Sequence, residues 1–150
     1  MLNIVLVEPL IPQNTGNIAR TCAAIGARLH IIKPIPFEIS DKTVKRAGLD
    51  YWQYLDLKIH ESLDDFLCIY KGSTFFFVET GSDLLYTEVK YTKDSFIFFG
   101  KETTGLPKDL LQSGLGKVVT IPTLEYIRSL NLSNAVAIVA YEALRQIRLI

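Results

Sequence analysis

Six short apolar runs alternate with stretches patterned for helices, and this alternation constrains the fold more than any other feature of the chain. The runs are rich in β-branched and aromatic residues and predict strands over residues 2–8, 29–33, 54–59, 74–79, 95–99 and 117–121. Helices are predicted over residues 15–25, 40–47, 62–70 and 132–147, with a short one between Pro107 and Gly114. Residues 62–65, Ser-Leu-Asp-Asp, resemble a capping box at the start of the third of these helices. Strands that alternate with helices predict an α/β fold, a mostly parallel sheet with helices on both faces. No linker interrupts residues 1–150, so we expect a single domain.

The charge balance argues against a binder with one strongly basic nucleic-acid face. The formal net charge of the 150 residues is zero. Residues 1–50 carry six Lys and Arg against four Asp and Glu, residues 51–100 four against eight, and residues 101–150 six against four. Contacts with phosphates must therefore come from local patches. Lys42, Lys45 and Arg46 form one such patch, although a solvated helix face explains them equally well.

The remaining composition indicates a cytoplasmic protein without a metal. The first seven residues lack a basic segment and are too short for a signal peptide or a membrane span. Cys22 and Cys68 form no CxxC pair, and His30 and His60 are isolated in the sequence. We therefore expect two buried free thiols, two ordinary histidines and no metal site.

Three polar or glycine-rich segments follow predicted strands, where ligands of open α/β sheets bind. In the first, Asn14, Asn17 and Arg20 recur every three residues, which predicts one helical face, and Gly16 permits close approach to the first turn. A capped helix with a solvated stripe is the alternative.

The second segment, residues 100–107, follows a strongly apolar run. Gly100 and Gly105 bracket Glu102 and two threonines. The segment lacks the GK[ST] ending of a P-loop, and no GxGxxG occurs in the chain. A tight turn into a helix that starts with proline is the alternative.

The third segment joins Ile121-Pro122 to residues 128–134, at the start of the last predicted helix. Ser133 or Asn131 can cap that helix. Arg128 is unfavourable beside the positive end of the helix dipole unless an anion or carboxylate lies nearby. Residues 135–140 are apolar all round, which predicts their burial.

Together the three segments resemble the three motifs of the SPOUT methyltransferases, in particular the SpoU-like branch. Residues 9–14 and 46–51 are similar to stretches of the small tRNA (cytidine/uridine-34) 2′-O-methyltransferases; Lys101 departs from the proline that relatives often carry. The resemblance implies an α/β knot with a C-terminal trefoil and S-adenosylmethionine as cofactor without a metal. It also implies a tRNA substrate bound at its anticodon region, and a homodimer packed through the first and last helices.

The resemblance also implies roles for individual residues. It assigns Arg20 to the substrate, with Asn14, Glu102, Asn131 and Ser133 positioning Arg20 and the ribose. It implies that the cofactor is bound largely by backbone groups of four residues, Val78, Gly100, Ile121 and Leu130. Glu79 and Ser129 are the neighbours of Val78 and Leu130 in the sequence and belong to the same site. A catalytically silent RNA- or nucleotide-binding α/β module is the alternative, which the intact set of motifs disfavours.

Overall fold

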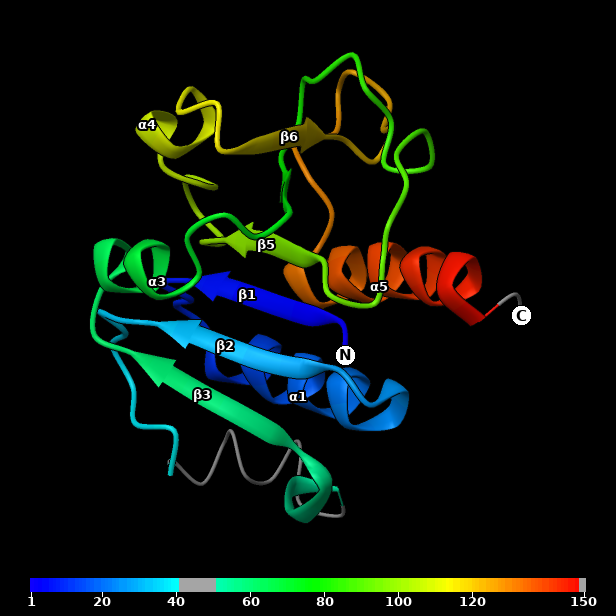
Figure 1. Ribbon diagram of the computed structural model, residues 1–150. Coiled ribbons are helices and arrows are strands. Elements are labelled where there is room, and N and C mark those ends of the chain that lie inside the picture. Colours follow the sequence, from blue (N-terminus) through cyan, green and yellow to red (C-terminus); the bar gives the residue numbers. More distant parts are fainter. Residues whose placement is uncertain (41–50, 149–150) are drawn as a thin grey trace.

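The structure is a computed structural model that describes residues 1–40 and 51–148 (Figure 1). Strands and helices alternate along most of the described chain, as the sequence predicts. The elements are β1 (Asn3–Val7), α1 (Pro12–Ile25), β2 (Arg28–Ile32), the 3-10 helix η1 (Trp52–Tyr54), β3 (Asp56–His60), α3 (Leu63–Ile69), β4 (Phe75–Val78), β5 (Phe96–Gly100), α4 (Lys108–Leu111), β6 (Gly116–Val119) and α5 (Leu132–Arg148).

The six strands form one sheet in the order β3-β2-β1-β5-β4-β6. Every pair of neighbouring strands among them is parallel, which confirms the predicted sheet. Strands β1, β2 and β3 follow one another toward one edge of the sheet. The chain then crosses to the other side of β1, where β4 forms and β5 lies between β1 and β4. The direction in which strands are added therefore reverses beside β1, and open parallel sheets bind ligands at such a point, at the carboxyl ends of the strands.

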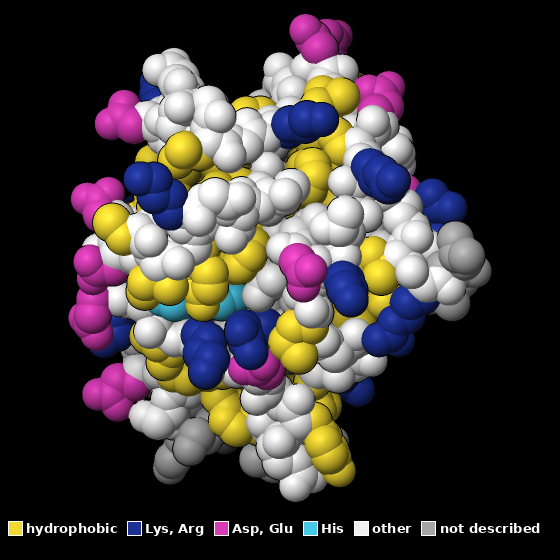
Figure 2. Space-filling model, in the orientation of Figure 1, with side chains coloured by type: hydrophobic (Ala, Val, Ile, Leu, Met, Phe, Trp, Pro, Cys, Tyr) yellow, Lys and Arg dark blue, Asp and Glu magenta, His cyan; other side chains and the backbone are white. Residues whose placement is uncertain are grey.

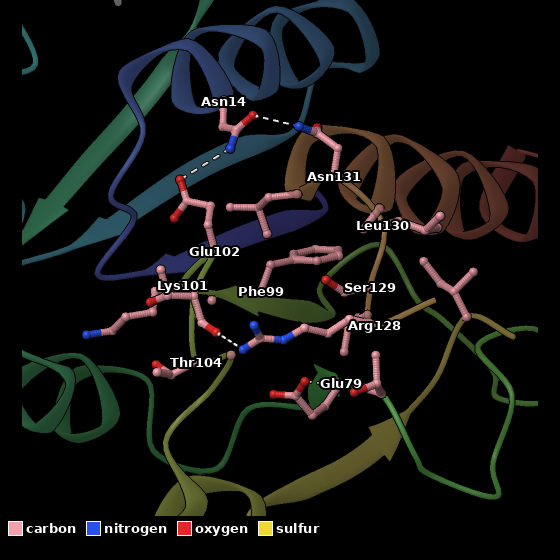
Figure 3. A pocket seen from close by; sticks show the side chains of 18 of the residues that line it. Asn14, Glu79, Phe99, Lys101, Glu102, Thr104, Arg128, Ser129, Leu130 and Asn131 are labelled. Carbon is pink, nitrogen blue, oxygen red and sulfur yellow. Dashed lines mark hydrogen bonds between the residues drawn. The ribbon is translucent and has the colours of Figure 1, made fainter. Parts of the chain in front are cut away.

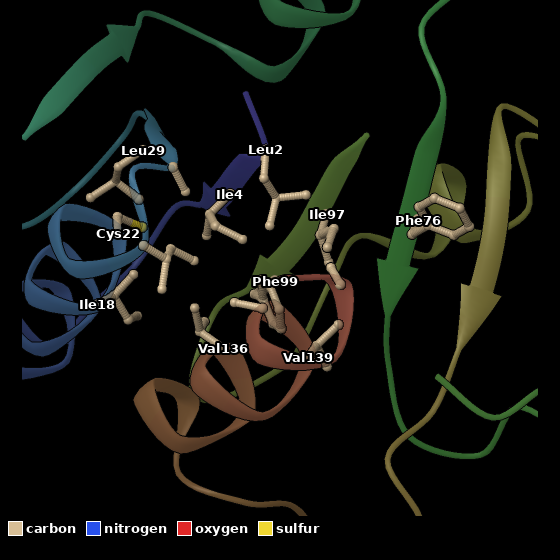
Figure 4. Packing of buried hydrophobic residues seen from close by; sticks show 14 of the residues in the cluster. Leu2, Ile4, Ile18, Cys22, Leu29, Phe76, Ile97, Phe99, Val136 and Val139 are labelled. Atoms are coloured by element: carbon tan, nitrogen blue, oxygen red, sulfur yellow. The ribbon is translucent and has the colours of Figure 1, made fainter. Parts of the chain in front are cut away.

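Alternate residues of each strand point to opposite faces of the sheet, and helices cover both faces. On one face, Ile4 and Leu6 of β1 pack with α1 and α5 (Figure 4). On the other face, Val5 and Val7 pack with Phe66 of α3 and Leu110 of α4. Both faces of the inner strands are buried, which explains why β1, β2, β4 and β5 are strongly apolar, whereas the edge strands β3 and β6 are largely half-buried or exposed.

Several element boundaries differ from those predicted. α1 begins at Pro12 rather than at residue 15, because proline suits the first position of a helix. Ser62 caps α3 as expected, its hydroxyl accepting from the Asp65 backbone N–H at 3.1 Å. The third strand is predicted to begin at residue 54 but begins at Asp56. The 3-10 helix η1, which the sequence did not predict, precedes it. The helix predicted over residues 40–47 and the Lys42, Lys45 and Arg46 patch lie outside the described residues.

Two predictions about burial need correction. Cys22 is buried as predicted, but Cys68 is exposed because it lies on the solvent side of α3. In α5, Val136 and Val139 are buried, whereas Ile138 is 37% exposed on the side away from the sheet. His30 and His60, which lie thirty positions apart in the sequence, meet in the fold, because parallel pairing of β2 with β3 brings two of their ring nitrogens within 3.0 Å of each other.

Within residues 1–40 and 51–148, no group of three or more His, Cys, Asp or Glu could hold a metal ion. No helix of the described part is both long and apolar enough to cross a membrane.

Candidate active site

One cavity of about 480 Å³ lies at the carboxyl ends of β4, β5 and β6 (Figure 3). All three polar segments contribute to its lining, together with the end of β4 and the start of α5. The six residues expected to hold a cofactor all line it: Val78, Glu79, Gly100, Ile121, Ser129 and Leu130. The structure thus brings together residues that lie more than a hundred positions apart, such as Asn14 and Asn131, which are separated by 117.

The loop after β5 closes on itself. Lys101 and Gly105 exchange two backbone hydrogen bonds, with N···O distances of 3.1 and 2.9 Å. Gly105 has a φ of +73°, and a Cβ there would collide with the Glu79 carboxylate. That carboxylate in turn accepts from the Leu106 backbone N–H at 2.9 Å. The positive φ favours glycine at this position, and a side chain here would also displace the Glu79 carboxylate.

Arg128 spans the cavity from the third segment to the second. Its guanidinium donates to the backbone carbonyl of Thr103 (Figure 3). In the described structure the partner of this cation near the start of α5 is thus a backbone carbonyl oxygen. The contact ties the two loops that wall the cavity to each other.

Glu102 caps α1 from a distant part of the chain. The residue at the helix N-cap, Ile11, has no side chain that could accept a hydrogen bond, and the first turn holds no acidic residue. The Glu102 carboxylate accepts from the backbone N–H groups of Leu10 and Ile11, at 2.8 and 2.7 Å. A carboxylate at this end also complements the helix dipole. Glu102 therefore anchors the start of α1 to the loop that follows β5.

A chain of side-chain hydrogen bonds joins the three segments. Asn131 caps α5, its Oδ1 accepting from the Ser133 and Asn134 backbone N–H groups at 2.9 and 3.3 Å. Its Nδ2 therefore faces Asn14, whose Oδ1 accepts at 3.1 Å. Asn14 Nδ2 then donates to Glu102 at 3.3 Å (Figure 3). The backbone donors of α5 thus fix both amide orientations.

Asn14, Asn17 and Arg20 do not share one environment, so the single helical face predicted for them is wrong. Asn14 is buried against Glu102 and Asn131, whereas Asn17 and Arg20 are exposed. Steps of three residues turn through about 300°, so two steps fall about 120° short of full turns. Arg20 is not one of the described residues that line the cavity, and its Cζ lies 5.0 Å from the centroid of the Tyr51 ring.

Two of the five residues expected to act on the substrate stand at the edge of this arrangement. Ser133 does not line the cavity in the described structure; its hydroxyl donates to Asn131 Oδ1. Arg20 lies farther along α1. Conversely, two residues that line the cavity, Thr80 and Thr123, lie outside every segment that the sequence analysis named. Both lie within two residues of a predicted strand end, which is the signal that could have found them.

The cavity suits a ligand with one apolar and one polar part. Val78, Ile121 and Leu130 supply apolar surface, while Thr80, Thr104 and Ser129 add hydroxyl groups. Its volume lies within the range of roughly 300–1,000 Å³ usual for small-molecule sites. A nucleoside-sized molecule fits both the volume and this division of the lining.

Comparisons with known proteins agree with this architecture. A solved structure described as "Structural insights into the 2-OH methylation of C/U34 on tRNA" matches with a TM-score of 0.93 and 42% identity, covering 97% of this chain and 95% of that one. A tRNA (cytidine(34)-2′-O)-methyltransferase of Saccharophagus degradans is 43% identical over 98% of this chain and 96% of its own length. A Bacillus subtilis (strain 168) protein that bears this name provisionally is 49% identical, over 97% and 92% of the two chains.

The family model described as the SpoU rRNA Methylase family matches residues 1–141, nearly the whole chain. The matched region includes all three polar segments and the cavity between them. The chain belongs to the SpoU methylase family.

Proposed function

We propose that this protein transfers a methyl group from S-adenosylmethionine to the ribose 2′-hydroxyl of nucleotide 34 of a tRNA. The names of its relatives support this substrate. The observation that carries the proposal is the hydrogen-bonded chain Glu102–Asn14–Asn131, which fixes the cofactor-sized cavity against the helix that bears Arg20.

The cavity would hold the cofactor through both the backbone and the side chains of its loops. Val78, Ile121 and Leu130 offer apolar surface for an adenine ring, and the backbone of Gly100 borders the same space. When bound, S-adenosylmethionine supplies a methyl group on a sulfonium that a ribose oxygen can displace. The loops bind and orient it, because near-attack geometry provides much of the rate of such displacements.

Arg20 would act on the substrate rather than on the cofactor. It is exposed on α1, outside the cavity lining. A guanidinium keeps its proton in proteins, so Arg20 is poorly suited as a general base. It can stabilise the developing alkoxide and orient the adjoining phosphate with its fork of N–H donors.

Glu102 and the two asparagines would position this helix. Both Glu102 oxygens accept from protein N–H groups, which occupies the atoms that a general base would turn toward a ribose. We therefore assign positioning roles to Glu102, Asn14, Asn131 and Ser133.

A homodimer within the cytoplasm is the assembly that we propose. Ile138 and Tyr141 lie on the side of α5 away from the sheet and are 37% and 49% exposed. Basic and acidic side chains are interspersed on the face of one chain that Figure 2 shows. Two copies paired through α1 and α5 would combine basic patches for the anticodon region of a tRNA across an isologous interface.

A C-terminal trefoil knot within a single 150-residue domain completes the proposal. Thr120 exchanges backbone hydrogen bonds with Leu84 and Tyr86, in the loop between β4 and β5. The chain then runs past Thr103, which accepts from Arg128, before it enters α5. A segment held between two loops in this way supports a threaded path.

Mass spectrometry of tRNA tests the proposal. A strain of the source organism that lacks this protein should lose one 2′-O-methyl nucleotide, at position 34, and the wild-type gene should restore it. Retention of that nucleotide in the deletion strain would contradict the proposal. Binding of S-adenosylmethionine without loss of any methyl mark would instead favour a catalytically silent binding module.

A further inference from the structure

The Arg20 guanidinium lies over the aromatic ring of Tyr51, a residue to which no role has been assigned above. Its Cζ is 5.0 Å from the centroid of the Tyr51 ring, within the range of a cation–π contact. We propose that Tyr51 is a positioning residue that orients the Arg20 guanidinium for methyl transfer. This inference rests on the role proposed above for Arg20.

Tyr51 is well placed to hold an arginine of α1. Its backbone carbonyl accepts from Tyr54 N–H at 3.0 Å, which closes the turn of η1. The next residue, Trp52, packs against the core cluster that contains Ile18 and Ala19 of α1. The turn that carries the ring is therefore anchored to the same side of the sheet as the helix that carries Arg20.

A ring is a suitable support for a guanidinium that must act on an anion. An exposed arginine samples many rotamers, and fixing it costs conformational entropy at each turnover. A carboxylate partner would fix it but would also neutralise its charge and occupy its N–H donors. A ring face contacts only the π surface of the guanidinium, so the in-plane donors stay available for an alkoxide or a phosphate.

Single-turnover methylation at saturating cofactor tests this role. Tyr51→Leu should slow transfer by about 3- to 30-fold, a range that corresponds to exposed and desolvated cation–π contacts. Tyr51→Phe, which keeps a ring, should be faster than Tyr51→Leu. Tyr54→Leu is the matched control, because Tyr54 belongs to the same turn but is 72% exposed; it should leave the rate unchanged. Calorimetry should give the same S-adenosylmethionine affinity for all three variants.

Two further measurements separate positioning from a merely structural role. Phenylalanines at position 51 with increasing fluorination keep the ring shape but withdraw its electron density, and the rate should fall with each added fluorine. In an Arg20→Ala background, which removes the cation, Tyr51→Leu should cost less than twofold, because Tyr51 acts through Arg20.

Equal rates along the fluorinated series, or the same loss in both backgrounds, would overturn the proposal. If Arg20→Ala is slow while Tyr51→Leu is as fast as wild type, the role of Tyr51 alone fails. If Arg20→Ala is as fast as wild type, the proposed role of Arg20 fails first.

Discussion

Arg20 is the side chain on which the proposed chemistry depends most. Arg20→Ala should lower the single-turnover rate of methyl transfer by roughly 10²–10³, the usual cost of losing one donor to a developing oxyanion. Arg20→Lys keeps the charge but loses the planar fork, so it should stay impaired. Calorimetry should show unchanged S-adenosylmethionine affinity, since Arg20 does not line the described cavity.

Two outcomes would reassign the residue. An Arg20→Ala variant that weakens cofactor binding as much as it slows transfer would place Arg20 in the cofactor site. A variant nearly as fast as wild type would show that Arg20 does not stabilise the developing alkoxide.

The pair formed by the buried His30 and the half-buried His60 has a defined arrangement of ring protons. Asn3 Nδ2 donates to the Met1 carbonyl at 3.0 Å, so its Oδ1 must accept from His30 Nε2. His30 Nδ1 is then the acceptor for His60 Nε2–H at 3.0 Å. Burial, reinforced by the nearby His60, lowers the pKa of His30 to about 3. Protonating His30 would set two donors against each other.

The stability of the protein should therefore fall in mild acid. The folded pKa of His30 lies below its unfolded value near 6.5, so the stabilisation is complete above pH 6.5 and is lost as the pH falls toward 3. From pH 7 to pH 5 the free energy of unfolding should drop by about 2 kcal/mol. Urea unfolding at both pH values measures this drop. His30→Gln, which does not titrate, should make the drop smaller, with the remainder due to His60, whose pKa burial also lowers; an equal drop in that variant would place the effect elsewhere.

At the level of secondary-structure elements, the cap that Glu102 provides for α1 makes a separate prediction. Glu102→Gln keeps the side-chain shape but replaces one accepting oxygen with an NH₂ group that faces N–H donors. The variant should lose about 1–2 kcal/mol of stability. Hydrogen exchange should also quicken at the Leu10 and Ile11 amides.

Glu125→Gln serves as the charge-matched control, because Glu125 is exposed in the loop before α5. It should change neither stability nor exchange at these amides. If Leu10 and Ile11 exchange equally fast in wild type and Glu102→Gln, Glu102 does not hold the start of α1.

The elements show where sequence reasoning succeeds and where it ends. Periodicity and turn residues located the strands and the Ser62 cap, because these signals are local. The common edge of parallel strands also predicted that the three polar segments would meet. The Glu102 contacts with Leu10 and Ile11 join residues more than ninety positions apart, which no local pattern encodes. The burial of Asn14 follows from that same contact.

At the scale of the whole molecule, we predict a dimer from the exposed apolar side chains of α5. Tyr141→Asp would place a charge in the proposed interface and should give a monomer with reduced methylation activity. Ile69→Asp is the control, since Ile69 is 64% exposed on α3, which covers the opposite face of the sheet. Sedimentation should find twice the mass of one chain for wild type and Ile69→Asp. A monomeric wild type with full activity would refute the dimer.

The most direct measurement of the proposed reaction uses two tRNA molecules that differ by one atom. Both carry the same sequence, and one has a 2′-deoxyribose at nucleotide 34 alone. Purified protein with radiolabelled S-adenosylmethionine should transfer one methyl group to the all-ribose tRNA and none to the deoxy form, because the accepting oxygen is missing. Equal labelling of both molecules, or no labelling of either, would contradict 2′-O-methylation of this nucleotide.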